Sequence, residues 1–494
     1  MQAFPVYGLK GTMVKYALCF WALSQAISHP NWKGSKVEVK RRDFIRGALT
    51  AGAYGMAGRD FGFAAAADAA ALPLPTPAHL KWADMELGMF YHYDIPIFGS
   101  GHAPSPKCYN PEKLDTDQWM EAAKAYGAKY VVLTAKHGAG FMQWQSDIYP
   151  YGVKQSPWRG GKGDLVRDFV TSARKYGMLP GLYVAMHYNW FLGVRRSNGR
   201  VSSKGYYGYG EEAQRKYAAS CEAVLNELLT NYGELFEIWF DGGVLPPEEG
   251  GPRALEIIER LQPNAILFQG PKQAKNIIRW VGNERGVAPY PCWATGRDVT
   301  QSDGVKESKG EKYAGTPEGK KWMPGECDVP LGPCKWLCTS KGRYWTMDEL
   351  VNMYDCSVGR NCNLILNAAP LQSGLVADEE MKIYAEFGRR IKARYSNRLA
   401  KTEGTGERID LEIPKDGGPV NQVVLMERIE RGERIRKFDI EALSGGQWKK
   451  IYAGSCVGHK HIVRFDKIAA ERLRLSVTAS AATPLIRDFS AYCN

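Results

Sequence analysis

Two carboxylic acids stand at the ends of apolar segments, where a pair of acidic groups could do chemistry. Asp241 follows residues 237–240 (EIWF), and Glu284 follows residues 279–283 (RWVGN). Two carboxyl groups that face one cavity can divide the work of glycoside hydrolysis. One attacks the anomeric carbon, while the other protonates the leaving oxygen and then activates water. Any large fold offers several acidic side chains at its rim, so this pair indicates the chemistry without fixing it.

Eight short apolar segments must position these residues. The predicted strands cover residues 87–93, 130–135, 181–185, 235–240, 265–269, 277–281, 322–327 and 363–367. Their near-continuous hydrophobicity is typical of strands that are buried on both faces of a parallel sheet. Eight strand–helix alternations predict an α/β fold, a (β/α)8 TIM-like barrel, with its reactive groups at the carboxyl ends of the strands.

Polar side chains gather at those predicted strand ends. They are His92, Asp94, Lys136, His137, His187, Asp241, Gln269, Glu284, Glu326 and Asn367. Two long segments, 189–210 and 294–320, follow strands on the same side, where such barrels keep their substrate-handling insertions.

The helices between the strands have readable ends. Asp115 is expected to cap a helix that Gly127 closes, and Asp164 a second helix that stops at Gly177. A last helix is predicted over residues 377–394. Beyond it, apolar and polar residues alternate at 409–413 and 473–477, which predicts a small antiparallel β-sandwich. We therefore expect a catalytic barrel over residues 73–398 and a sandwich over residues 399–494.

Residues 1–72 are expected to be an export leader. Residues 40–46 (KRRDFIR) resemble a twin-arginine signal, and an alanine-rich segment at 64–71 offers A-x-A cleavage points. This pattern predicts an exported protein, periplasmic or extracellular. The alternative is a chance arginine pair ahead of an alanine-rich linker.

Composition excludes several classes of protein. The 494 residues carry a net charge of +12, but residues 1–72 account for +5 of it and the other basic residues are scattered among acids. This distribution argues against nucleic acid as a partner. No apolar run of 18 or more residues occurs, so no membrane span is expected in the mature chain. Cys334 and Cys338 lack a second pair or a close histidine to complete a zinc site, so we predict no metal and no cofactor.

The chain resembles the family 29 α-L-fucosidases of the glycoside hydrolases from about residue 80 to its end. The matching segments are 82–93 (WADMELGMFYHY), 129–144 (KYVVLTAKHGAGFMQW), 163–183, 238–243 (IWFDGG), 279–286 (RWVGNERG), 322–329 (WMPGECDV) and 357–367 (SVGRNCNLILN). Residues 422–492 are similar to the C-terminal sandwich of one branch of that family.

This resemblance implies a retaining exo-glycosidase that releases α-L-fucose from oligosaccharides or glycoconjugates. Asp241 matches the nucleophile, and Glu284 matches the general acid/base of the branch that cleaves α-1,3/1,4-linked fucose. His92 and His137 match histidines that hold sugar hydroxyls. The further substrate-binding candidates are Trp144, Arg279, Trp82, His187 and Trp322. Trp144 and Phe141 are expected to pack against the ring and its C6 methyl group, and Arg279 to keep Asp241 ionised.

The chain also departs from the family pattern. Gly138 and Ala139 stand where many members carry a second histidine and an aspartate, and residues 97–100 replace a common Glu-Trp pair. Asp94 and His102 are candidates to supply the missing contacts. Two alternatives stay open: the same mechanism on another α-L-glycoside, such as an α-L-galactoside, and a non-catalytic glycan-binding protein.

Overall fold

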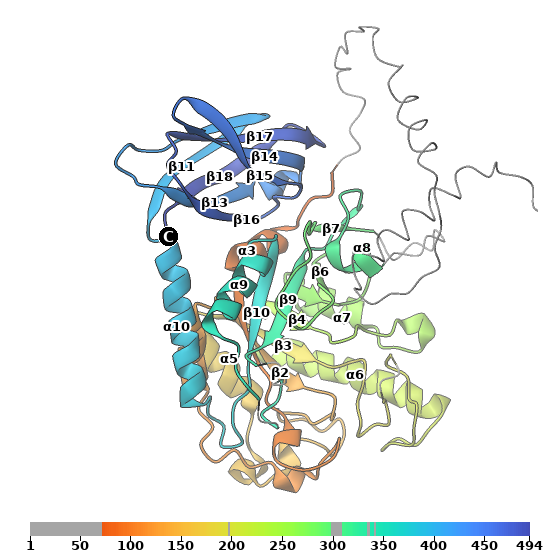
Figure 1. Ribbon diagram of the computed structural model, residues 1–494. Helices are drawn as coiled ribbons and strands as arrows, with labels where there is room; N and C mark the ends of the chain where they lie inside the picture. The colour runs from red at the N-terminus through yellow and green to blue at the C-terminus, as the bar shows by residue number, and fades with distance from the viewer. Residues whose placement is uncertain (1–71, 196–197, 298–308, 333–335, 340–341) are drawn as a thin grey trace, which may run out of the picture. The chain divides into compact units, whose positions relative to one another are not determined.

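The computed structural model describes residues 72–195, 198–297, 309–332, 336–339 and 342–494. The expected leader, apart from residue 72, and Cys334 lie outside the described residues. Residues Asp68–Asn494 form one compact unit that contains both a barrel and two antiparallel sheets (Figure 1).

The predicted (β/α)8 barrel is confirmed. Eight parallel strands of the described chain close in the order β1-β10-β9-β6-β5-β4-β3-β2. Their bounds are β1 Leu87–Tyr91, β2 Tyr130–Lys136, β3 Leu179–Val184, β4 Glu237–Trp239, β5 Ile266–Phe268, β6 Ile277–Trp280, β9 Gly325–Pro330 and β10 Cys362–Ala368. Nearly all of their residues are buried, as expected of strands covered on both faces.

The seventh barrel strand begins later than predicted. We expected it over 322–327, but Lys321–Trp322 form a separate strand, β8, which pairs antiparallel with β7 (Thr295–Gly296) outside the barrel. Pro324 separates β8 from β9, because proline has no N–H to donate to a continuous sheet. The barrel strand therefore starts at Gly325, and Asp328 lies near its carboxyl end.

Helices cover the barrel. Their bounds are α3 Pro77–Met85, α4 Thr116–Tyr126, α5 Leu165–Lys175, α6 Glu211–Asn231, α7 Ala254–Leu261, α8 Lys309–Ala314, α9 Met347–Ser357 and α10 Asp378–Arg394. Both predicted caps are present: the Asp115 carboxylate accepts from the amides of Asp117 and Gln118, and the Asp164 carboxylate accepts from the amide of Arg167.

The predicted C-terminal β-sandwich is also confirmed. In the described chain its sheets have the orders β11-β18-β13-β16 and β12-β17-β14-β15. The bounds are β11 Arg398–Thr405, β12 Arg408–Glu412, β13 Val420–Glu427, β14 Ile435–Ser444, β15 Gln447–Gly454, β16 His461–Ile468, β17 Arg472–Ser480 and β18 Leu485–Tyr492. Alternating side chains of these strands form a core of their own.

Buried polar contacts join the sandwich to the amino end of the barrel. Glu433 accepts from the Ala294 amide at 2.9 Å and from the Asn361 side chain at 2.5 Å. Lys460 forms an ion pair with Glu86, the residue that directly precedes β1. The sandwich is thus tied to the barrel by buried and half-buried polar groups.

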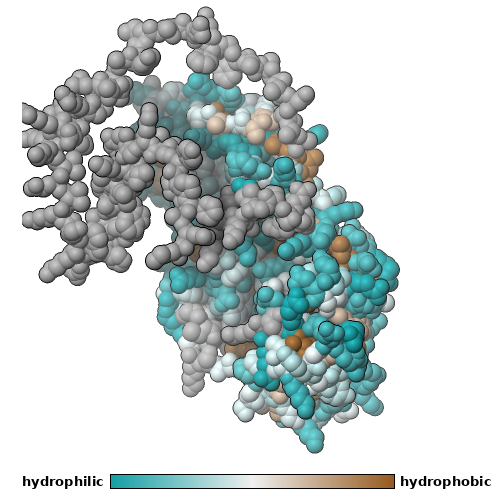
Figure 2. Space-filling view, turned by 90° about the vertical axis from the view of Figure 1, so that its right-hand side faces the viewer, coloured by the Kyte–Doolittle hydropathy of each residue, from teal (hydrophilic) through white to brown (hydrophobic). Residues whose placement is uncertain are grey.

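The face of the molecule in Figure 2 is mostly hydrophilic, and its apolar residues lie in small separate groups. Within the described part of the chain, no helix combines the length and apolar character needed to cross a membrane.

Candidate active site

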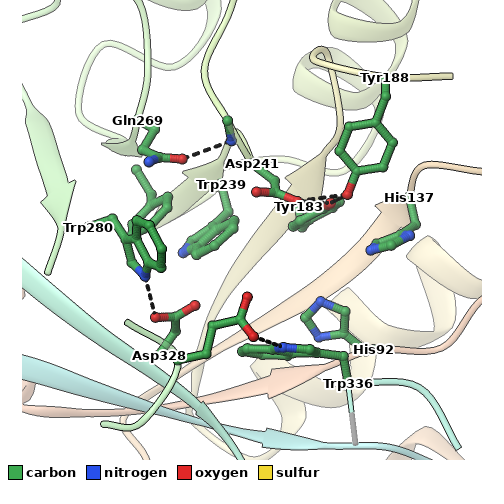
Figure 3. Close-up of a pocket in the computed structure, with 13 residues that line it drawn as sticks. His92, His137, Tyr183, Tyr188, Trp239, Asp241, Gln269, Trp280, Asp328 and Trp336 are labelled. Atoms are coloured by element: carbon green, nitrogen blue, oxygen red, sulfur yellow. Dashed lines mark hydrogen bonds between the residues drawn. The ribbon is translucent and has the colours of Figure 1, made fainter. Parts of the chain in front are cut away.

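A cavity of about 420 Å³ lies at the carboxyl ends of the barrel strands. Its walls are aromatic rings interrupted by a few polar groups, which is typical of a small-molecule site (Figure 3). The lining residues are His92, His137, Tyr183, Tyr188, Trp239, Asp241, Gly242, Phe268, Gln269, Trp280, Glu284, Asp328 and Trp336.

Asp241 lies two residues after the end of β4 and is held by two tyrosine hydroxyls. Tyr183 donates to its Oδ2 at 3.0 Å, and Tyr188 donates to the same oxygen at 2.8 Å. The next residue, Gly242, has a positive φ of 74°, and a Cβ there would lie 2.7 Å from the His187 ring. The turn after β4 therefore needs glycine, and it aims the carboxylate into the cavity (Figure 3).

Glu284 lies on the loop that follows β6 and is exposed at the rim. Its Oε2 accepts a hydrogen bond of 2.8 Å from the indole of Trp336. Because Glu284 and Asp241 line the same cavity, the barrel brings together two carboxyl groups from strands that are far apart in sequence.

The two predicted histidines enter the cavity as neutral rings. His92 follows β1, and its Nδ1 lies 2.7 Å from Asn367 Oδ1. Burial lowers its pKa well below the ordinary value. Burial likewise lowers the pKa of His137, which follows β2, to about 4. A neutral imidazole can both donate and accept, which suits the recognition of sugar hydroxyls.

Asp94, a candidate for direct sugar contact, lies behind the cavity wall. It is fully buried and does not line the cavity, while its Oδ2 lies 4.0 Å from His137 Nδ1. His102, the other candidate, lines a neighbouring cavity and stacks on Trp190 with ring centroids 3.8 Å apart. Asp94 thus lies next to His137 but does not reach the cavity.

The floor of the cavity is a stack of aromatic rings. Trp239 lies on Phe268 with centroids 3.6 Å apart, and its other neighbour Tyr183 is 5.5 Å away. The Trp239 indole donates to Glu326 in the barrel interior at 2.9 Å. These contacts fix the orientation of the Trp239 ring in the cavity wall.

Two further cavities adjoin the first. One, of about 500 Å³, shares His137, Tyr188 and Asp241 with it. The other, of about 430 Å³, lies beyond Gly242 and includes Arg279. The predicted residue His187 lines both of these neighbouring cavities but not the first one.

Besides His187, four further predicted substrate-binding residues do not line the first cavity. Trp144 is buried in the core, where its indole donates to Glu227 at 2.7 Å, and Trp82 and Trp322 are buried in a second core cluster. Arg279 points away from Asp241, since its guanidinium donates to the backbone oxygens of Met323 and Trp293. It therefore holds loops together and does not pair with the carboxylate.

Sequence reasoning missed the aromatic lining. Tyr183, Trp239 and Trp280 lie within predicted strands and were not singled out there. Asp328 belongs to the strand whose start was misplaced. Their position at the carboxyl ends of strands was the available signal. Trp336 lies in an irregular segment that carries no periodic pattern.

Comparisons with known proteins agree with this geometry. The family described as alpha-L-fucosidase matches residues 77–394. Alpha-L-fucosidase 1 of Arabidopsis thaliana is 30% identical over 476 residues, which cover 85% of this chain and 88% of that protein.

Solved structures share the fold. A protein of Bacteroides thetaiotaomicron that is provisionally named an alpha-L-fucosidase is 36% identical, with a TM-score of 0.78, and covers 86% of this chain and 100% of its own. A family 29 fucosidase of Ruminococcus gnavus, solved in complex with fucose, is 22% identical with a TM-score of 0.72 over 86% of this chain and 96% of its own. At that identity the likeness concerns the fold alone.

Proposed function

This chain belongs to the α-L-fucosidase family of glycoside hydrolases, and we propose that it removes terminal α-L-fucose from oligosaccharides or glycoconjugates with retention of configuration. The observation that carries the proposal is that Asp241 and Glu284, from two separate strands, line one cavity. Retention needs two carboxyl groups that act on opposite sides of one glycosidic bond.

In the first step, a carboxylate oxygen of Asp241 forms a bond to C1 of fucose while the bond from C1 to the leaving oxygen breaks. Glu284 gives its proton to that oxygen, which departs as the hydroxyl of the shortened glycan. The hydroxyls of Tyr183 and Tyr188 hold Asp241 in line for this attack. The sugar is then joined to Asp241 as an ester.

In the second step, Glu284 is a carboxylate and takes a proton from water. The resulting hydroxide bonds to C1, the ester to Asp241 breaks, and Glu284 is protonated again. Two inversions at C1 return the α configuration. The same tyrosine hydroxyls stabilise the carboxylate that leaves, because hydrogen bonds to a charged acceptor are the stronger ones.

Recognition of the sugar is assigned to neutral polar groups and aromatic faces. His92 and His137 offer donors and acceptors to its hydroxyls, and Trp239 offers a flat face to its apolar side and C6 methyl group. We assign Trp144, Trp82, Trp322 and Arg279 to the scaffold instead, since none of them lines this cavity.

An α-L-galactoside is the second candidate substrate, because the segment with Gly138 and Ala139 departs from the family pattern. It differs from a fucoside by one hydroxyl at C6, which an apolar wall would leave without a partner. Activity on matched aryl glycosides of the two sugars decides between them. We expect the fucoside to be preferred, and preference for the galactoside would reverse the assignment.

Roles of the two carboxyl groups are tested by substitution. We expect Asp241→Ala to lower kcat by several orders of magnitude, as does loss of a nucleophile generally. Glu284→Ala should be restored by azide on an aryl fucoside, with a fucosyl azide as product, since azide needs no general base. Failure of azide to restore this variant, with the protein folded, would contradict the role of Glu284.

We also propose that the protein is exported, from the twin-arginine-like residues 40–46 and the alanine-rich segment that follows. The amino-terminal sequence of the mature protein from its own cells tests this. A terminus near residue 72 is expected, and an intact terminus on a protein confined to the cytoplasm would contradict it.

A further inference from the structure

Asn367 is a buried polar residue beneath the active-site cavity, and neither step above uses it. It lies near the carboxyl end of β10, a strand whose side chains face the barrel interior alternately. Ile365 packs in the interior together with Trp239, so Asn367, two residues later, faces inward one layer nearer the cavity. Because Asn367 is only 1% exposed, its amide group must find hydrogen-bond partners inside the protein.

The two ends of the Asn367 amide bind different parts of the site. Its Nδ2 donates to the backbone oxygen of Trp336 at 3.0 Å, and its Oδ1 lies 2.7 Å from Nδ1 of His92. A backbone oxygen can only accept, so the nitrogen of the amide must face Trp336. The oxygen of the amide then faces His92, and Nδ1 of His92 has to be the donor.

This arrangement decides which nitrogen of His92 carries the proton. The ring is neutral, because burial holds its pKa well below the ordinary value. A neutral ring with its proton on Nδ1 has a bare Nε2, which can only accept. Within the described ranges no protein group is hydrogen-bonded to this Nε2, and the ring lines the cavity. The donor that Nε2 can take is therefore a hydroxyl of a bound sugar.

The other end of the Asn367 amide leads to Glu284. The residue that Asn367 holds by its backbone oxygen, Trp336, donates from its indole to Glu284 Oε2 at 2.8 Å. The rings of Trp336 and His92 lie side by side, with centroids 4.8 Å apart (Figure 3). One buried side chain thus contacts both a sugar-binding residue and the residue that holds the proton donor.

We propose that Asn367 is a positioning residue with two effects: it fixes His92 as the acceptor of a hydrogen bond from a sugar hydroxyl, and it holds Trp336 so that the indole orients Glu284. The proposal rests on the function assigned to His92 and Glu284 above. It implies that the sugar must offer a hydroxyl hydrogen to His92, since an ether oxygen or a fluorine at that place cannot donate.

Nitrogen nuclear magnetic resonance of the folded, histidine-labelled protein reads the tautomer without any measurement of activity. The ring signals that disappear in His92→Gln belong to His92. We expect a proton on Nδ1 and a bare Nε2 in wild type, and a population with the proton on Nε2 in Asn367→Leu. A wild-type ring that carries its proton on Nε2 overturns the proposal, as does an Asn367→Leu spectrum identical to that of wild type.

Two substrates separate the two effects of Asn367. A nitrophenyl α-L-fucoside has a good leaving group that needs little protonation, whereas a fucosyl disaccharide has a poor one. A weaker contact with the sugar lowers kcat/KM on both, and a misplaced Glu284 lowers it further on the disaccharide alone. For Asn367→Leu we expect a fall of about 10-fold on the aryl fucoside and about 100-fold on the disaccharide. Equal falls overturn the role toward Glu284, and an unchanged aryl fucoside overturns the role toward His92.

Trp336→Phe isolates the second effect, because it keeps a ring and the backbone oxygen but removes the indole N–H. We expect kcat/KM to fall about 10-fold on the disaccharide and to change little on the aryl fucoside. Adding Asn367→Leu should then lower both substrates by the same factor, since the contact with Glu284 is already lost. If the two substitutions multiply fully on the disaccharide, Asn367 does not act through Trp336 and this part of the proposal is overturned.

Asn363→Leu is the matched control on the same strand. Asn363 is also 1% exposed and also donates to a tryptophan backbone oxygen, that of Trp82 at 2.7 Å, but it lies at the opposite end of β10 from the cavity. Any loss of activity in Asn363→Leu should be the same factor on both substrates. If the disaccharide suffers more, as in Asn367→Leu, general loosening of the barrel explains both variants and the proposal is overturned.

The tests remain decisive if one variant fails to fold. Asn367→Ala then replaces Asn367→Leu with the same expectations, and the tautomer of His92 in wild type needs no substitution at Asn367. If wild-type protein cleaves no fucoside, the function proposed above fails. Normal cleavage with the His92 proton on Nε2 overturns only the present inference.

Discussion

Aromatic N–H and O–H groups hold the carboxyl groups in and beneath the cavity. Such donors orient a carboxyl group without adding the positive charge of lysine or arginine. The pairs are Tyr183 and Tyr188 with Asp241, Trp336 with Glu284, Trp280 with Asp328, and Tyr130 and Trp239 with Glu326.

The weight of one such contact can be measured at Tyr188. Tyr188→Phe removes a hydrogen bond to the attacking carboxylate, and hydrogen bonds to charged groups are worth about 1.5–3 kcal/mol. We therefore expect kcat/KM on an aryl fucoside to fall about 10- to 100-fold. Tyr209→Phe, at an exposed tyrosine, should have no effect. A Tyr188→Phe enzyme within about twofold of wild type would mean that the contact does not serve catalysis.

For single residues, the sequence predicted the positions of polar side chains in the site better than those of aromatic ones. A polar side chain at the end of a buried strand stands out, which is why His92, His137 and Asp241 could be placed together. A tryptophan fits a core and a ligand wall equally well. Trp144 was therefore expected in the site and packs in the core, while Trp239, for which no role was predicted, lines the site.

Loops after neighbouring strands interlock to shape the site. Gly138, in the turn after β2, leaves room for the ring of Tyr188 from the loop after β3, and a Cβ there would lie 1.9 Å from that ring. The space beside Gly138 is filled by a tyrosine from another element. This contact was invisible in sequence, because it joins residues from two loops.

Gly138→Ala tests the packing of the turn after β2 against Tyr188. The added methyl group must displace Tyr188 from Asp241, so we expect a fall in kcat/KM at least as large as that of Tyr188→Phe, about 10-fold or more. Combining both substitutions should cost little beyond the larger single effect, because they remove the same contact. Gly342→Ala, where a Cβ meets open space, is the control. If the effects of Gly138→Ala and Tyr188→Phe were fully additive in the double variant, Gly138 would act by something other than its contact with Tyr188.

The barrel and the sandwich were predictable because apolar segments alternate with helices in the first and apolar residues alternate with polar ones in the second. A single proline, in contrast, moved the start of β9. The whole molecule depends in addition on contacts between barrel and sandwich, which no local pattern reveals. Glu86 is an example. Burial raises its pKa, but Lys460 and His459 from the sandwich outweigh burial and hold the pKa at about 2.

This shift predicts how stability depends on pH. Because the folded pKa lies below the ordinary value of 4.5, Glu86 stabilises the fold fully above about pH 4.5 and loses this contribution as the pH falls toward 2. We expect Glu86→Gln to lower the free energy of unfolding by about 2 kcal/mol at pH 7 and by little near pH 2. Glu403→Gln, which loses an exposed ion pair with Arg428, should change stability by less than about 1 kcal/mol. Equal effects of Glu86→Gln at both pH values would contradict this account.

The covalent intermediate is the point on which the mechanism depends most directly. A fucosyl fluoride with fluorine at C2 should inactivate the protein, because the C2 fluorine slows both steps while the fluoride leaving group at C1 keeps formation of the ester fast. Mass spectrometry of the digested protein then locates the sugar. We predict one fucosyl group per chain, on the peptide with Asp241 and on that carboxylate. A label on Glu284 or Asp328 instead, or turnover with inversion and no label, would contradict the double displacement at Asp241.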